Sequence, residues 1–151
     1  MPELQTSTAS VPLAELAAAA DDLRAALVWA LEQEYPEPAL RLTGSLWWFW
    51  YLHGEYAEGR RWIESALERA GGIESPARAR TLLGAARLCF LQCDYPGAEQ
   101  LLAQASELAR RMGESRVLAA ALQFSGSIAR ERGQYDEAMR LHGESLELWR
   151  E

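Results

Sequence analysis

Three stretches of this chain repeat one pattern, and this repetition constrains the fold more than any other feature. In "HGEYAEGRRWIESALERA", "QCDYPGAEQLLAQASELA" and "RGQYDEAMRLHGESLELW", Tyr56, Tyr95 and Tyr135 recur at intervals of 39 and 40 residues. A small residue follows each tyrosine after three positions, and another small residue follows after ten. The small residues are Gly59, Ala98 and Ala138, then Ala66, Ala105 and Ser145. A period of this length is typical of stacked helix pairs, in which each pair buries its apolar face on its neighbours.

The segments around these repeats are predicted to be helical. Ala, Leu, Glu, Gln and Arg dominate, apolar residues return every three or four positions, and strand-like alternation is absent. Seven helices are expected: a first helix over 11–33, preceded by a flexible leader over 1–10, and three helix pairs at about 36–71, 75–112 and 114–150. Ser10, Ser75 and Asp94 are predicted N-caps, while Gly113 closes the helix before it.

Composition argues against several function classes. The chain has 151 residues, with 22 acidic and 15 basic side chains and a net charge of −7, so a direct nucleic-acid partner is not expected. Every basic residue is arginine, which excludes a P-loop lysine and a Schiff-base lysine. The sequence has neither a signal peptide nor an apolar stretch long enough to cross a membrane, and a cytoplasmic location is expected.

The reactive side chains form no recognisable catalytic or metal-binding pattern. Cys89 and Cys93 lie four residues apart in one predicted helix, and Cys89 is expected to be a small core residue. His53 and His142 fall in different repeats without partners at ligand spacing. We therefore expect no enzyme activity, no metal site and no cofactor.

The turn pattern G-x-Y-x-x-A resembles the tetratricopeptide repeat, whose usual period is about 34 residues. The longer period here places extra residues between one pair and the next. The resemblance implies an all-α, right-handed solenoid that binds a protein or peptide.

Two further segments resemble a narrower family. "ADDLRAALVWALEQ" (20–33) and "LWWFWYLHGEYAEGRRWIESAL" (46–67) are similar to the start of the repeat region in large bacterial ATP-binding LuxR-type transcriptional regulators. This resemblance implies a role in bacterial signalling or transcription regulation. The sequence carries neither the ATPase nor the DNA-binding domain of those regulators, and it can be a fragment or a stand-alone relative.

Five consecutive aromatic residues, Trp47 to Tyr51, turn through more than a full circle on a helix and must contact several neighbours. Burial of most of them is expected, because exposing even three would forfeit about 10 kcal/mol. Aligned to the repeats, Trp47 is predicted to lie opposite Gly59 where the two helices of a pair cross. Trp50 is expected in the core with Cys89 and Ala129, and Phe49 on the first helix through Leu27 or Leu31.

The resemblance to the tetratricopeptide repeat also implies that the first helix of each pair lines a concave groove. The resemblance places these residues there: Arg41, Trp48, Tyr51, Leu52, Arg80, Leu83, Arg87, Phe90, Leu91, Gln123, Ser127 and Arg130. Arginines beside aromatic rings can hold an acidic or aromatic peptide. Two alternatives stay open: the arginines pair with local glutamates and only cover apolar surface, or a small organic effector binds in a pocket near Trp48 and Phe90.

The last predicted helix leaves apolar residues without a following helix to cover them. Leu146, Leu148 and Trp149 lie on this helix, although repeat arrays normally end in a polar unit. Either a longer protein continues from here, or this end associates with another copy.

Overall fold

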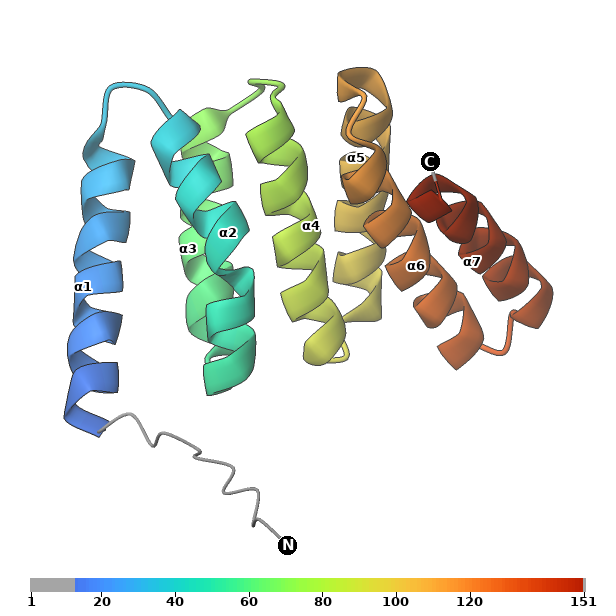
Figure 1. Cartoon of the computed structure of the whole chain (residues 1–151), viewed down its shortest axis with the longest axis horizontal. Helices are drawn as coiled ribbons and strands as arrows, with labels where there is room; N and C mark the ends of the chain where they lie inside the picture. The colour runs from blue at the N-terminus through green and yellow to red at the C-terminus, as the bar shows by residue number, and fades with distance from the viewer. Residues whose placement is uncertain (1–12, 151) are drawn as a thin grey trace, which may run out of the picture.

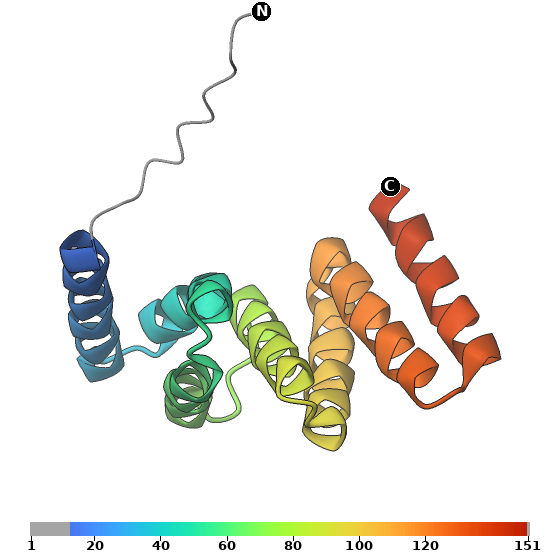
Figure 2. The same ribbon diagram turned by 90° about the horizontal axis from the view of Figure 1, so that it is seen from below.

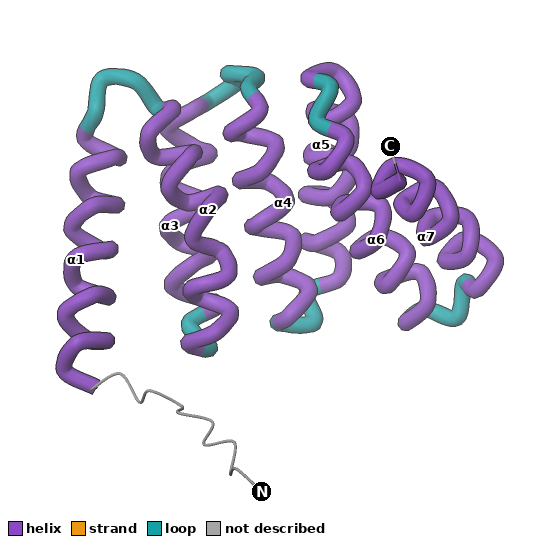
Figure 3. The backbone as a smooth tube through the Cα atoms, viewed as in Figure 1, coloured by secondary structure: helices purple, strands orange, loops and turns teal. Residues whose placement is uncertain are grey.

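The computed structural model describes residues 13–150, and the predicted leader over 1–10, with its cap Ser10, lies outside them. Seven helices follow one another, and these residues form no strand. The helices are α1 (Leu13–Glu32), α2 (Glu37–His53), α3 (Tyr56–Ala70), α4 (Pro76–Leu91), α5 (Tyr95–Met112), α6 (Ser115–Glu131) and α7 (Tyr135–Arg150). They stand in one row from α1 to α7 and zigzag when seen from below (Figures 1 and 2). Short loops join them at alternating ends (Figure 3). The all-α repeat architecture is confirmed.

The three repeats share one turn between their paired helices. The amides of Glu55, Asp94 and Gln134 each donate a hydrogen bond of 2.9 Å to a carbonyl five residues earlier, and the repeat tyrosine then begins the second helix of each pair. Those carbonyls belong to Trp50, Cys89 and Ala129, whose side chains are all buried as predicted. The tyrosine period therefore marks a repeated backbone structure.

Local signals in the sequence explain where several helices begin and end. Ser75 Oγ accepts a hydrogen bond from the Arg78 amide at 3.1 Å, and Asp94 Oδ1 accepts one from the Gly97 amide at 3.1 Å. These two side chains cap α4 and α5 as predicted. Gly113 ends α5 with a φ of 69°, a left-handed conformation that glycine adopts without a steric cost.

The core extends along the array, with burial shared between successive pairs. One cluster joins Leu27 of α1 and Trp50 of α2 to Ile63 of α3 and Leu88 of α4. A second cluster continues through α4, α5 and α6 and includes Leu102. Phe49 packs against the first cluster, to which Leu27 of α1 belongs. Since each pair completes its core on the next, the helices of neighbouring pairs are held at fixed positions.

Polar contacts between repeats recur at equivalent positions. Arg60 Nη1 donates to Gln92 Oε1 at 3.0 Å, and Arg132 Nη1 donates to Glu99 Oε1 at 2.7 Å. In both cases a residue four positions after one repeat tyrosine meets a residue three positions before the next tyrosine. Donor and acceptor exchange sides, so the spacing of the contact is retained while its polarity reverses.

The predicted contact between Trp47 and Gly59 is wrong. A Cβ atom on Gly59 would lie 2.7 Å from the Trp50 ring and 2.8 Å from Leu88 Cδ1. Trp47 lies instead against Gly84 of the following pair, where an added Cβ would be 3.2 Å from the Trp47 Cβ. Trp50 fills the crossing within the pair, and Trp47 fills the contact between pairs.

The close packing at Gly59 predicts that Gly59→Ala lowers the free energy of unfolding by about 1–3 kcal/mol, since the added methyl group overlaps two core side chains. Gly143→Ala is the matched control, because nothing lies within 4 Å of its added Cβ in α7. That change should stabilise the chain by roughly 0.5–1 kcal/mol through helix propensity. Urea unfolding measures both values, and equal effects of the two variants would contradict the packing described here.

A second prediction concerns the ion pair that ties α1 to α3. Arg24 Nε and Nη2 donate to the two carboxylate oxygens of Glu58 at 2.8 and 3.0 Å, and this interaction lowers the Glu58 pKa below its ordinary value. A lowered carboxyl pKa stabilises the fold above the unfolded-state pKa, and this contribution is lost as the pH falls through the folded-state pKa. Glu58→Gln should therefore cost up to about 1 kcal/mol at pH 7 and progressively less in acid. Unfolding measured between pH 7 and pH 3 tests this, and a difference that does not depend on pH would contradict it.

Candidate peptide-binding groove

Two adjoining hollows lie over α2, α4 and α6. The first, of about 470 Å³, is bordered by Glu37, Leu40, Arg41, Gly44, Ser45, Pro76, Ala77 and Arg80. The second, of about 410 Å³, is bordered by Gly44, Arg80, Leu83, Arg87, Glu114, Arg116, Val117, Ala120 and Trp149. Because both are bordered by Gly44 and Arg80, they form one depression, called the arginine groove below.

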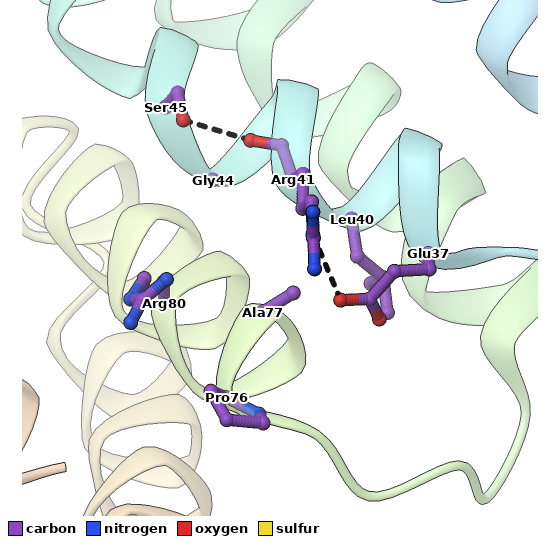
Figure 4. A pocket seen from close by; sticks show the side chains of 8 residues that line it. All are labelled: Glu37, Leu40, Arg41, Gly44, Ser45, Pro76, Ala77 and Arg80. Carbon is purple, nitrogen blue, oxygen red and sulfur yellow. Dashed lines mark hydrogen bonds and ion pairs between the residues drawn. The ribbon is translucent and has the colours of Figure 1, made fainter.

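Close approach of α2 and α4 forms the floor of the groove between the first two pairs. An added Cβ on Gly44 would lie 3.0 Å from Thr81 Oγ1, so a larger residue there would press on Thr81. Thr81 is fully buried, and its hydroxyl lies 2.7 Å from the Leu40 carbonyl of α2. Figure 4 shows Arg41 and Arg80 on the two facing helices at the first hollow.

Arginines dominate the charged lining of the groove, although the chain as a whole is acidic. Arg41, Arg80, Arg87 and Arg116 border it, against Glu37 and Glu114. Arg41 Nε pairs with Glu37 Oε1 at 3.0 Å, and Arg80 Nη2 pairs with Glu114 Oε2 at 2.9 Å. Arg41 and Arg80 thus pair with local glutamates, which was one of the alternatives left open. Arg87 and Arg116 then give the groove an excess of positive charge.

Arg87 differs from the other arginines in its surroundings. Its Cζ atom lies 4.2 Å from the centre of the Trp47 ring and 5.5 Å from the centre of the Phe124 ring. Among residues 13–150 its side chain forms no ion pair and donates no hydrogen bond, and its Nε is buried without a partner. Burial lowers the Arg87 pKa to about 10, so the side chain still carries its charge at neutral pH. The groove therefore contains a cation whose charge no neighbouring carboxylate neutralises.

The remaining predicted groove residues border neither hollow. Trp48, Tyr51 and Leu52 are exposed on α2 and border neither hollow. Phe90 is half-buried, with its ring centre 5.5 Å from that of Phe124. The others lie outside the two hollows: Leu91 is half-buried, Ser127 bonds the Gln123 carbonyl, Gln123 is exposed, and Arg130 pairs with Glu131 at 3.2 Å.

Several groove residues were not predicted from the sequence, among them Arg116 and Trp149. Arg116 lies in the first turn of α6, and Trp149 lies near the end of α7. The prediction considered only the first helix of each pair, and α7 is a second helix. Trp149 was therefore not considered, whereas Arg116 lies on a first helix, α6, at a position that the resemblance does not place in the groove.

The apolar residues of α7 have different environments. Leu148 packs against the cluster formed by Leu122, Ala129 and Leu141, whereas Leu146 and Trp149 are each 50% exposed. In the earlier repeats, the position of Trp149 is occupied by buried alanines. Self-association through this end of the array stays a prediction.

The reactive side chains are placed as follows. Cys89 is buried, and burial raises its pKa to about 11, which keeps the thiol protonated at neutral pH. Cys93 is exposed. Over residues 13–150, the structure places no three His, Cys, Asp or Glu side chains together in a way that suits a metal ion. Within that same range, every helix is too short or too polar to span a bilayer.

Comparison with known proteins identifies the repeats. The family model of the tetratricopeptide repeat matches residues 51–111, so the chain carries a tetratricopeptide-repeat region. The chain is also 33% identical over 114 residues to each of two proteins named "Putative HTH-type transcriptional regulator", Mb0914c of Mycobacterium bovis and Rv0890c of Mycobacterium tuberculosis. The aligned part covers 70% of this chain and 13% of each relative. The resemblance to a repeat region of transcriptional regulators is thereby confirmed.

The unpaired charge of Arg87 leads to a prediction about stability. Arg87→Met keeps an unbranched stem beside Trp47 and removes a half-buried, unpartnered cation, whose partial desolvation costs on the order of 1–3 kcal/mol. The lost cation–π contact offsets about 0.5–2 kcal/mol of that gain. Urea unfolding of Arg87→Met should therefore give a free energy no more than about 1 kcal/mol below that of the parent, or above it. A loss of 2 kcal/mol or more would show that Arg87 is a structural residue.

Proposed function

We propose that this tetratricopeptide-repeat region is a non-catalytic interaction module that holds a protein segment in the arginine groove. The observation that carries the proposal is Arg87, a charged side chain kept unpaired between two rings at the surface of an open depression. Burying such a charge costs free energy, and a partner that supplies the opposite charge would offset this cost.

The form of the groove supports an extended protein segment. Its two hollows follow one another from Glu37 on α2 to Trp149 on α7, and arginines border both. Small-molecule sites are mostly enclosed and apolar. The alternative of a small effector requires a pocket near Trp48 and Phe90, and neither residue borders either hollow.

The relatives suggest the setting in which the module works. They are named as transcriptional regulators and are bacterial, and the aligned part is a small portion of their length. We place this chain in a bacterial regulator of the cytoplasm, where it relays binding of a protein partner. Its net charge of −7 supports a role in which this region does not contact DNA itself.

A peptide selection tests the proposal. The chain is immobilised, a random peptide library displayed on phage is selected against it, and the affinities of the selected peptides are measured by fluorescence anisotropy. Arg41→Ala with Arg80→Ala should weaken them at least tenfold, since these side chains border the first hollow.

Trp48→Ala is the matched control, because Trp48 is exposed on α2 but borders neither hollow. It should leave the affinities within about twofold. Peptides that respond to Trp48→Ala and ignore the two arginines would move the site off the groove, and failure to select any binder would contradict the proposed function.

A further inference from the structure

We propose that the second hollow of the arginine groove is a receptor for one carboxylate side chain, of Glu or Asp, with Arg87 as its anchor. This inference rests on the proposed function, because the carboxylate would belong to the protein segment held in the groove. It adds the chemical identity of the group that is recognised and the place where it is bound.

The first step is the fixed position of the Arg87 guanidinium. Stacking on Trp47 at 4.2 Å, with Phe124 nearby, holds its plane before any ligand arrives. Its Nε is covered, while Arg87 as a whole borders the hollow, so the terminal amino groups are the donors left for a ligand. Two parallel N–H donors in a rigid plane match the two oxygens of a carboxylate. Little side-chain entropy remains to be lost on binding.

The second step is the charge balance around Arg87. Arg80, Arg87 and Arg116 border the second hollow, and Glu114 is the one carboxylate among its lining residues. Glu114 is already bonded to Arg80 at 2.9 Å. An incoming anion therefore meets a net positive site without having to displace an existing ion pair.

The third step selects a carboxylate among the possible anions. One guanidinium is both fixed and free of a partner, and a singly charged carboxylate matches one such fork. A phosphate group carries up to two charges and is best held by several converging, fixed donors, whereas Arg80 is committed to Glu114 and the Arg116 side chain is exposed rather than held in place. Trp149 and Leu83 provide apolar walls in the same hollow, where the methylene groups of a Glu side chain can pack.

Nuclear magnetic resonance of the full chain, labelled with ¹⁵N-arginine, tests the site directly. The probes are acetyl-glutamate amide and its neutral isostere acetyl-glutamine amide, with sodium chloride at equal ionic strength as the salt control. The Glu probe should shift the Arg87 side-chain signals saturably at millimolar concentration. The Gln probe and chloride should bind at least tenfold more weakly, and the signals of Arg130, which pairs with Glu131, should not move.

Variants separate this site from general attraction to a basic surface. Arg87→Met should abolish binding of the Glu probe, seen at the Arg80 and Arg116 signals, and Arg87→Lys should weaken it at least tenfold while retaining a charge. Arg130→Met is the matched control and should leave binding unchanged. Equal responses to the Glu and Gln probes would overturn the proposal. Inorganic phosphate binding more than tenfold more tightly than the Glu probe would overturn the assignment to carboxylate.

The two proposals fail in different ways. If the Glu probe binds at Arg87 but no peptide is selected, the carboxylate site stands and the interaction function is lost. If selected peptides bind in the groove and tolerate both Glu→Gln changes and Arg87→Met, the function stands and the carboxylate site is wrong.

Discussion

The structure depends on each helix pair completing its core on the next pair. Ile63 is fully buried only because α2 and α4 lie on either side of α3, and Leu102 has the same position one repeat later. Gly59 allows Trp50 to approach within the pair, and Gly84 allows Trp47 to approach between pairs. These contacts set the spacing of α2, α4 and α6, and the arginine groove lies over these helices.

The sequence predicts those features that depend on neighbours along the chain. The spacing of Tyr56, Tyr95 and Tyr135 predicted the repeated turn, and Asp94 was recognisable as a cap because capping is a local interaction. The neighbour of Trp47 was assigned incorrectly. In a stacked array each helix has one neighbour within its pair and another in the next pair, and an alignment of small residues does not distinguish the two.

The groove illustrates the same limit. Arg41, Arg80 and Arg87 were predicted because the resemblance places their positions on the first helices in the groove, whereas Trp149 borders the groove because α7 packs on α6. The sequence also did not distinguish Arg87 from Arg41, Arg80 and Arg130. Three of these arginines pair with a glutamate. Only the structure shows that Arg87 lies against the Trp47 and Phe124 rings and has no such partner.

An acidic chain can recognise an acidic partner only where nearby arginines outweigh the more distant negative charges of the chain. At low ionic strength, the net charge of −7 repels an acidic segment before it reaches the groove. At physiological salt the screening length is about 8 Å, so distant charges contribute little and the nearby arginines dominate. Because Arg87 is partly covered, its attraction for a bound carboxylate is screened less than that of Arg130 on the surface. Moderate salt should thus favour access to the groove more than it weakens the bond formed inside.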